Sequence, residues 1–357
     1  MRSARPRLLS VIGARPEIIQ AAPLAAALEP VVDEVIVHTG QHYDDLMSEA
    51  QLLDTRLPRP AHNLEVGSRP DLEQLEVSER RLGEVLDGEP LDGVLVRGDT
   101  NATLAGARAA SRRGLPLLHV EAGLRSWRQD MPEERNRVET DRLSHVLFAP
   151  TEAARANLEA EGVAGEVHVT GDVLCDMLLS CRDRLPVTGE EEPYVLATVH
   201  RNYNTDSPER LGAVLECLGR ASRRVVFPVH PRTHKAVADW SLRVPPNVEL
   251  RDPVPYTLML GLERGAEAVA TDSGGVQREA YVWGVPCVTL REETEWIETV
   301  DTGWNTLVGA DPDRFAAALE RPRPSEHPPI FGGGDAAARI AALCAAYLSV
   351  AEEVGHA

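Results

Sequence analysis

The sequence predicts an α/β protein with two Rossmann-like, doubly wound domains. Short apolar runs alternate with segments of helical periodicity, as in parallel sheets built from βαβ units. This alternation stops at a looser segment, 185–192, and then starts again. The 357 residues are enough for two domains with a large core. Two such domains facing each other create a cleft, and ligands of these sheets lie outside the carboxyl ends of the strands.

The elements of the first half follow from its apolar runs. Each run of strand length leads into a turn, and most of these turns open a helical pattern. The predicted strands are 8–12, 35–38, 91–96, 115–120 and 146–149. The predicted helices are 16–28, 102–113, one that begins near residue 132, and 152–161.

The second half repeats the pattern and ends in a long helix. Its predicted strands are 195–199, 225–229, 248–250, 268–270 and 286–290, and its helices are 207–222, 256–264 and 276–283. A proline-rich connector, 322–329, precedes a final helix at 336–354. We therefore expect an N-terminal domain at 1–168 that carries the candidate acids and a nucleotide-binding domain at 169–335. The segment 336–357 is expected to pack back on the N-terminal domain.

Composition and charge exclude several classes of protein. A net charge of −19 disfavours nonspecific binding to nucleic acid or to an anionic membrane. No apolar run approaches the roughly 20 residues that span a bilayer, and the N-terminus reads as a strand and turn rather than a signal peptide. The five cysteines show no Cys-x-x-Cys spacing, which favours reduced thiols in the cytoplasm.

Carboxylates follow two predicted strands of the first half. Glu121 ends the strand 115–120, and Asp99 follows the strand 91–96 in Gly98-Asp99-Thr100. A carboxylate at the end of a buried strand is costly unless it is paired or functional. Asp99 has a structural alternative as a helix cap, a position for which Thr100 competes. His119 lies inside its strand and is predicted to be a hydrogen-bonded core histidine.

A third group of charged residues lies at the start of the helix near residue 132. Glu133 and Glu134 are followed one turn later by Arg137. The structural interpretation is that the acids complement the helix dipole and that Glu133 pairs with Arg137. Together with Asp99 and Glu121, the group also provides what is needed to remove and return a proton.

Other strand ends carry groups suited to an anion. Ser273-Gly274-Gly275 connects a strand to a helix, so its backbone N–H groups and helix dipole favour a phosphate, and Glu279 in that helix suits ribose hydroxyls. His200-Arg201 ends another strand, and Arg15 lies at a helix N-terminus. The structural alternatives are an N-cap with a flexible turn and a surface arginine. The sequence has no dinucleotide fingerprint and no Walker loop. Two His-x-x-x-His spacings, His38/His42 and His230/His234, straddle predicted strand ends and do not make a convincing metal site.

The motifs taken together resemble the non-hydrolysing UDP-N-acetylglucosamine 2-epimerase family. The matching segments begin at residue 13 and end at residue 279, in the family's order. They are Gly13-Ala14-Arg15-Pro16-Glu17, Thr39-Gly40-Gln41-His42-Tyr43-Asp44, Gly98-Asp99-Thr100, His119 to Arg125, Pro132-Glu133-Glu134 with Asn136-Arg137, His200-Arg201, His230 to Thr233, and Asp272 to Gln277 with Glu279.

This resemblance implies a fold, a reaction and a set of roles. The fold is that of the GT-B glycosyltransferases, the enzyme is a homodimer, and no cofactor or metal is needed. A base removes the proton from C2 of the sugar while UDP leaves C1, and UDP adds back after C2 is reprotonated on the other face. The acid and base roles fall to Asp99, Glu121 and Glu133, with Arg137 and His200 in support; which carboxylate is base and which is acid stays open. The implied UDP-binding residues are Arg15, His200, Arg201, Ser273, Gly274, Gly275 and Glu279.

The chain departs from the family pattern at several positions. Gln20 stands where the family usually has a lysine, and Ala14 where it has a threonine. The sequence around Trp296 looks like the branch that acts on UDP-2,3-diacetamido-glucuronic acid, although Trp296 also suits a packing role. Candidate specificity residues are Gln20, Gln41, His42 and Trp296. Asp44 replaces the glutamine of members that a second UDP-sugar activates, so such regulation is not expected.

The predicted function is therefore the interconversion of UDP-GlcNAc and UDP-ManNAc. One alternative is a 2-epimerase of a modified UDP-HexNAc such as UDP-2,3-diacetamido-glucuronate. Others are a GT-B glycosyltransferase and a non-catalytic UDP-sugar binder. The only expected small-molecule partner is a UDP-sugar.

Overall fold

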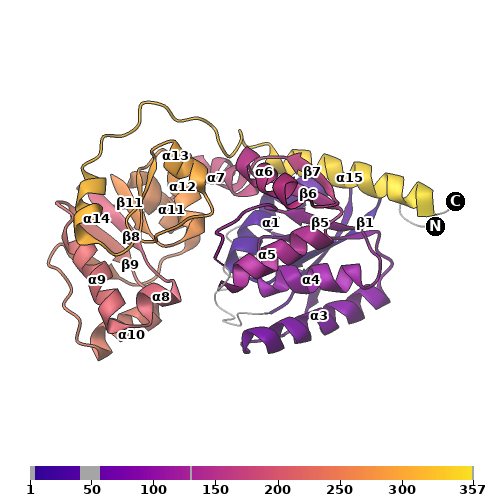
Figure 1. Cartoon of the computed structure of the whole chain (residues 1–357), viewed down its shortest axis with the longest axis horizontal. Helices are drawn as coiled ribbons and strands as arrows, with labels where there is room; N and C mark the ends of the chain where they lie inside the picture. Colours follow the sequence, from indigo (N-terminus) through magenta and orange to yellow (C-terminus); the bar gives the residue numbers. More distant parts are fainter. Residues whose placement is uncertain (1–4, 41–56, 129–130, 356–357) are drawn as a thin grey trace. The chain divides into compact units, whose positions relative to one another are not determined.

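The chain divides into two units, and the first contains both ends of the sequence. The structure is a computed structural model that describes residues 5–40, 57–128 and 131–355. The first unit comprises Met1–Ser180 and Ile330–Ala357, and the second comprises Cys181–Pro329 (Figure 1).

The first unit contains a parallel sheet in the order β3-β2-β1-β4-β5-β6-β7. Its strands are β1 (Arg7–Ile12), β2 (Asp33–His38), β3 (His62–Asn63), β4 (Gly93–Arg97), β5 (Leu117–Val120), β6 (Val146–Ala149) and β7 (Glu166–Val169). The strand order reverses between β1 and β4. That reversal is the topological switch point of a doubly wound sheet.

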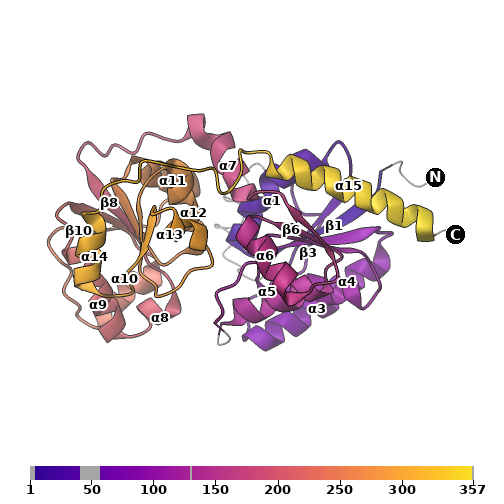
Figure 2. The same ribbon diagram turned by 45° about the horizontal axis from the view of Figure 1, so that its top comes forward.

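Helices cover both faces of this sheet (Figure 2). They are α1 (Arg15–Leu28), α3 (Asp71–Gly88), α4 (Asn101–Ser111), α5 (Pro132–Leu143), α6 (Glu152–Glu161), α7 (Val173–Cys181) and α15 (Ala336–Gly355). Side chains alternate between faces along each strand. Leu9 and Val11 of β1 therefore pack with α3 and α4, whereas Leu8 packs with α1 and α15.

Helices α7 and α15 belong to the same packed region of the first unit. The Asp176 carboxylate of α7 accepts hydrogen bonds from the backbone N–H groups of Ala336 (3.2 Å) and Ala337 (2.7 Å), at the start of α15. Ile340 and Cys344 of α15 share a buried apolar cluster with Val173. The division of the chain at residue 181 thus differs from the expected boundary at 168/169, because α7 packs with the returning helix.

The second unit contains a parallel sheet in the order β10-β9-β8-β11-β12-β13. Its strands are β8 (Tyr194–Thr198), β9 (Arg224–Pro228), β10 (Val248–Arg251), β11 (Ala268–Thr271), β12 (Cys287–Thr289) and β13 (Asn305–Leu307). The order reverses between β8 and β11, so each sheet has one switch point.

The helices of the second unit also form two layers. They are the 3-10 helix η1 (Arg182–Arg184) and the α-helices α8 (Asn202–Thr205), α9 (Pro208–Gly219), α10 (Pro231–Asp239), α11 (Tyr256–Gly265), α12 (Gly274–Trp283), α13 (Ile297–Asp301) and α14 (Pro312–Leu319). Helices α9 and α14 share one apolar cluster with the sheet, and α11 and α12 share another.

The two doubly wound units confirm the predicted fold class. The bounds of β6 and α6 equal the predicted ones, and the other predicted elements differ by a few residues at their ends. The structure adds elements that the sequence did not indicate, such as α3, α7 and β13. Among the described residues, no helix has the length and hydropathy that crossing a bilayer requires. All five cysteines lie in the described ranges, are buried and form no disulfide.

Gly123, which follows β5, is expected to be irreplaceable. Its φ is +85°, and a Cβ built there would overlap the backbone oxygen of Ala154 in α6. We expect Gly123→Ala to lower the stability of the first unit by about 3 kcal/mol. The slowest-exchanging amides of the first sheet would then exchange about 100-fold faster. Gly88→Ala is the control, because a Cβ there meets nothing within 4 Å; equal exchange in both variants would contradict the prediction.

Candidate active site

The candidate residues lie around the switch points of the two sheets. In the first unit, Arg15 begins α1 after the turn that follows β1, Asp99 lies in the turn after β4, and Glu121 follows β5. In the second unit, the turn after β8 holds His200, and the turn after β11 holds Ser273. These carboxyl ends of strands are where doubly wound sheets bind ligands.

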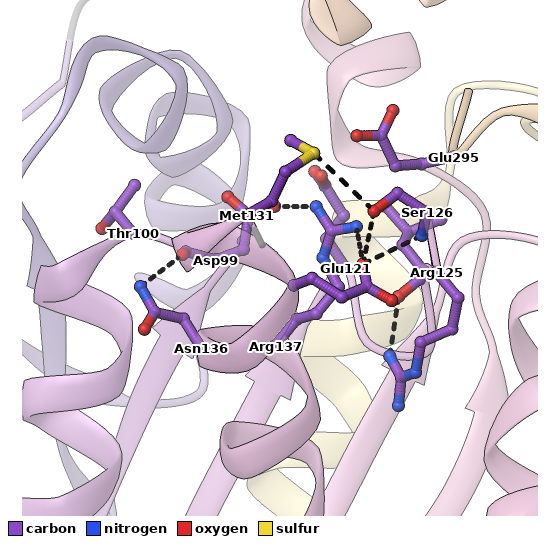
Figure 3. Close-up of polar contacts among 12 residues, drawn as sticks. Asp99, Thr100, Glu121, Arg125, Ser126, Met131, Asn136, Arg137 and Glu295 are labelled. Atoms are coloured by element: carbon purple, nitrogen blue, oxygen red, sulfur yellow. Dashed lines mark hydrogen bonds and ion pairs between the residues drawn. The ribbon is translucent and has the colours of Figure 1, made fainter. Parts of the chain in front are cut away.

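Asp99 is paired with an arginine of α5. The Arg137 guanidinium contacts Asp99 Oδ2, and the Asn136 side-chain amide donates to the Asp99 backbone oxygen at 3.0 Å (Figure 3). Arg137 is buried, whereas the Asp99 side chain keeps 26% of its surface exposed. The Thr100 hydroxyl, not Asp99, caps α4 by accepting from Ala102 N and Thr103 N. The Asp99 carboxylate is therefore left outside the helix cap and beside a cation.

Glu121 takes an unusual backbone conformation directly after β5. Its φ is +69°, in the left-handed region that residues other than glycine rarely adopt. The side-chain amide of Gln20, which is buried in α1, donates a hydrogen bond to Glu121 Oε2. Gln20 thus contacts a candidate catalytic carboxylate. β4 and β5 are adjacent, with Arg97 opposite Val120, so Asp99 and Glu121 leave neighbouring strands.

Glu17, one of the matched motif residues, organises the turn after β1. Its carboxylate is 1% exposed. It accepts hydrogen bonds from the N–H groups of Gly13 (2.5 Å) and Ala14 (2.8 Å) and from the hydroxyls of Thr100 (2.6 Å) and Thr103 (2.9 Å). Burial nevertheless raises the pKa of Glu17, against the lowering effect of these four hydrogen bonds. Glu17 therefore ties the turn that carries Arg15 to the start of α4.

The sequence interpretation of Glu134 as an acid that only complements the helix dipole is corrected by its contacts. Its carboxylate accepts from Ser126 N (2.9 Å), Ser126 Oγ (2.8 Å), Trp127 N (3.0 Å) and Arg137 Nη1 (3.0 Å). Glu134 is 2% exposed and holds both the loop after β5 and the arginine that contacts Asp99. Glu133 precedes it in the first turn of α5 and is partly buried.

His119 is a core residue, as predicted. It is fully buried, and its Nδ1 lies 2.7 Å from Asp141 Oδ1. Its Nε2 lies 2.8 Å from the backbone oxygen of Gly98. The ring is therefore bonded on both sides within the first unit.

A buried carboxylate also organises the turn after β8 in the second unit. Asp272, fully buried after β11, accepts from His200 N (3.1 Å), Arg201 N (3.0 Å) and the Asn204 amide (2.9 Å). The His200 side chain keeps 53% of its surface exposed, with Nδ1 3.5 Å from Asp272 Oδ1. Asp272 thus fixes the backbone of the His200-Arg201 turn and leaves the imidazole accessible.

The Ser273-Gly274-Gly275 segment opens α12 directly after this aspartate. The Ser273 hydroxyl caps the helix by accepting from Val276 N at 3.4 Å. Gly274 lies against the indole nitrogen of Trp296, which a Cβ built on Gly274 would approach to 3.2 Å. Trp296 is buried, and the Arg278 guanidinium stacks on its ring at 4.2 Å from the centroid. Trp296 therefore packs against the start of α12, which fits the packing interpretation.

Glu279 lies one turn further along α12 and is buried. Its Oε1 accepts a hydrogen bond from the Tyr256 hydroxyl at 2.8 Å. The structure therefore gives this carboxylate a partner within the unit. Its predicted contact with a ribose stays a prediction.

The structure brings four of the predicted site residues together in two pairs and leaves two predicted residues undescribed. Asp99 meets Arg137, and Glu121 meets Gln20. Gln41 and His42 lie outside the described residues. Within the ranges that the structure describes, no group of three or more His, Cys, Asp or Glu side chains is arranged to hold a metal ion.

Sequence reasoning missed the buried acids that hold these turns. Glu17 and Asp272 were quoted only as parts of matched motifs, and Asp141 was not singled out. Each accepts backbone hydrogen bonds. The sequence did carry a signal for them: each acid lies within a few residues of a glycine, at the start or end of a helical pattern. This signal does not distinguish a structural acid from a catalytic one.

Comparison with known proteins gives consistent matches over nearly the whole chain. Residues 25–345 match the family model described as UDP-N-acetylglucosamine 2-epimerase. The chain is 40% identical over 352 residues to the UDP-2,3-diacetamido-2,3-dideoxy-D-glucuronate 2-epimerase of Pseudomonas aeruginosa, covering 94% of this chain and 98% of that relative. It is 39% identical over 331 residues to a UDP-N-acetylglucosamine 2-epimerase of Methanococcus maripaludis, covering 87% and 90% of the two chains.

A solved structure matches equally well. The crystal structure of Methanocaldococcus jannaschii UDP-GlcNAc 2-epimerase in complex with UDP-GlcNAc and UDP has a TM-score of 0.87 and 38% identity. The match covers 95% of this chain and 99% of the other. It confirms the predicted GT-B-like fold.

Replacing Asp272 should loosen the turn after β8. Asp272→Asn would place an amide N–H₂ group against backbone donors, so we expect the amides of His200 and Arg201 to exchange about tenfold faster. Hydrogen exchange with residue resolution measures this. Asp239→Asn is the matched control, because Asp239 lies on the surface beside Lys235. Unchanged exchange at His200 and Arg201 would show that Asp272 does not hold the turn.

Proposed function

Because the chain belongs to the UDP-N-acetylglucosamine 2-epimerase family, we propose that it interconverts UDP-GlcNAc and UDP-ManNAc. Family membership and the names of the relatives make it a UDP-sugar 2-epimerase, an isomerase. We assign the acid and base roles because two carboxylates, Asp99 and Glu121, follow the adjacent strands β4 and β5. We further propose, from the family resemblance alone, a cytoplasmic homodimer.

The proposed reaction has two halves, elimination and re-addition of UDP, and each half moves one proton and one UDP group. A carboxylate takes the proton from C2, the C1–O bond to UDP breaks with its electron pair, and a C1=C2 double bond forms. A second group returns a proton to the other face of C2, and the UDP oxygen attacks C1. Inversion thus needs proton-transfer groups on both faces of the sugar. We assign these roles to Asp99 and Glu121, with Glu133 as a third candidate.

Cations near these acids serve the departing diphosphate. Arg137 lies beside Asp99, so it can stabilise negative charge near the reacting carbons. In the second unit, we propose that the helix N-terminus at Ser273-Gly274-Gly275 and the exposed imidazole of His200 bind the phosphates. The remaining proposed UDP contacts are Arg15, Arg201 and Glu279.

Sequence identity to one relative favours a second candidate substrate. The 40% identity to the UDP-2,3-diacetamido-2,3-dideoxy-D-glucuronate 2-epimerase equals or exceeds that to the UDP-GlcNAc enzymes described above. Gln20 contacts Glu121, so the departure from the family lysine lies at the acid itself. The diacetamido uronate is therefore the second candidate. Gln41, His42 and Trp296 remain proposed specificity residues.

Solvent deuterium tests the proposed function. In deuterated water, the enzyme supplied with UDP-GlcNAc alone should place deuterium at C2, because the returned proton comes from a solvent-exchanged acid. Mass spectrometry of UDP-HexNAc measures the label. Parallel incubation with UDP-2,3-diacetamido-glucuronate separates the two candidates. No label in any UDP-HexNAc would overturn the proposal, and turnover only with an added acceptor would indicate a glycosyltransferase.

The same assay tests the roles of the acids. We expect Glu121→Gln and Asp99→Asn to lower kcat at least about 1,000-fold, because an amide cannot exchange the proton. Glu152→Gln on the exposed face of α6 is a matched control that should leave kcat unchanged. Wild-type turnover in either acid variant would contradict its role.

Changing Gln20 should reveal what Glu121 does. A lysine ammonium beside Glu121 favours the ionised carboxylate, typically by about 1 pH unit or more. In Gln20→Lys, one limb of the pH profile of kcat should therefore move to lower pH. Movement of the acidic limb identifies Glu121 as the base, and movement of the basic limb identifies it as the acid. Gln20→Met, which adds no charge, is the control; equal profiles for both variants would show that the charge at position 20 does not reach Glu121.

A further inference from the structure

Asp141 of α5 connects three segments that carry candidate catalytic groups. Its carboxylate is fully buried, and both oxygens are engaged. Oδ1 lies 2.7 Å from His119 Nδ1 in β5. Oδ2 accepts from Gly123 N at 3.2 Å and from Arg125 Nη1 at 2.8 Å, in the segment after β5.

His119 extends this connection to the turn after β4. Its second ring nitrogen, Nε2, donates to the backbone oxygen of Gly98 at 2.8 Å, and Gly98 directly precedes Asp99. Asp141 therefore reaches the Glu121 segment through Gly123 and the Asp99 turn through His119. It does so from the helix that also carries Glu133 and Arg137.

Within these two turns, Glu121 has a backbone conformation that requires support, whereas Gly98 and Gly123 tolerate a positive φ because they have no side chain. Gly98 has a φ of +67°, Glu121 of +69° and Gly123 of +85°. A glutamate in the left-handed region costs free energy of order 1 kcal/mol and persists only where its surroundings hold it. The hydrogen-bonded Gly98 directly precedes Asp99 in the chain, and the hydrogen-bonded Gly123 follows shortly after Glu121. A shift of either turn would displace a carboxylate that must reach C2.

We infer that Asp141 and His119 are positioning residues of the epimerase: they hold Asp99 and Glu121 in reacting geometry without touching the substrate. This inference rests on the proposed function. It goes beyond the family resemblance, which assigned no role to Asp141. It also explains why a fully buried acid and a fully buried histidine lie under this edge of the sheet.

The hydrogen-bond geometry also assigns a proton to one nitrogen of the His119 ring. The Gly98 carbonyl can only accept, so Nε2 carries the proton of that hydrogen bond. Nδ1 bonds to Asp141 Oδ1, and the other oxygen of Asp141 accepts from Gly123 N and the Arg125 guanidinium. Arg125 also pairs with Glu161 of α6 at 2.7 Å. Each polar atom of the His119 and Asp141 side chains thus has a partner, as burial requires.

Asp141→Asn tests the role by activity. The change keeps the shape and removes the charge, so we expect kcat to fall about ten- to 100-fold while KM changes less than about threefold. Asp87→Asn, on the surface beside Arg113, is the matched control and should keep wild-type kcat. Wild-type kcat in Asp141→Asn would overturn the inference, provided that the wild-type enzyme is active.

Imidazole ¹⁵N NMR gives a second readout that does not depend on turnover. With histidine labelled on the ring nitrogens, Nε2 of His119 should carry a proton in the wild-type protein, and that proton should exchange slowly with solvent. In Asp141→Asn the same proton should exchange at least about tenfold faster, because the bond that holds Nδ1 is weakened. An unprotonated Nε2 in the wild-type protein, or equal exchange in the two proteins, would overturn the inference even if the protein had no epimerase activity, so the two failures are distinguishable.

A further pair of variants covers the case in which Asp141→Asn does not fold. His119→Gln keeps an N–H donor near the Nε2 position for Gly98, whereas His119→Leu keeps none. We expect the glutamine variant to retain at least about tenfold more kcat than the leucine variant, with similar UDP affinity in both. Equal kcat values in the two variants would contradict the role of the Gly98 hydrogen bond.

Discussion

Hydrogen bonds from backbone N–H groups to buried carboxylates shape the turns that carry the candidate active-site residues. Glu17 holds the turn after β1, Glu134 and Asp141 hold the segment after β5, and Asp272 holds the turn after β8. Each of these acids is at most 2% exposed. A strand end leaves backbone donors without a sheet partner, and each of these carboxylates accepts from one or two of them. The positions of the exposed functional groups depend on these bonds.

A buried carboxylate is tolerated only where donors surround it. Glu17 shows the balance, because burial raises its pKa although two amides and two hydroxyls donate to it. Asp141 and Glu134 receive cationic as well as neutral donors. Such sites are rigid, because moving any donor away leaves a charge unsatisfied. A rigid frame of this kind suits a reaction in which two acids must reach one carbon from opposite faces.

The two units contribute different chemistry to the proposed reaction. The first provides Asp99, which contacts a guanidinium, and Glu121, which accepts a hydrogen bond from a side-chain amide. The second provides a capped helix N-terminus next to an exposed imidazole, the groups that we propose bind the diphosphate. In both units a buried acid contacts the segment or side chain that positions a more exposed functional group. Asp272 does this for His200, and Glu134 does it for Asp99 through Arg137.

The sequence alone determined the fold class, the family and the strand ends at which function is placed. Apolar periodicity is local, so β6 and α6 could be predicted to the residue, and His119 could be assigned to the core because it lies within a strand. The short strand β13 and the weakly apolar helix α3 carry less of this signal and were missed. Only the tertiary structure decided which acids support the turns and which face outward. Asp141 meets the Gly123 amide from 18 positions away, and Asp272 meets the His200 amide from 72 positions away. Such hydrogen bonds form between groups that only the completed sheet brings together. The sequence shows that a residue is Asp or Glu, but not whether its carboxylate accepts backbone hydrogen bonds or transfers a proton.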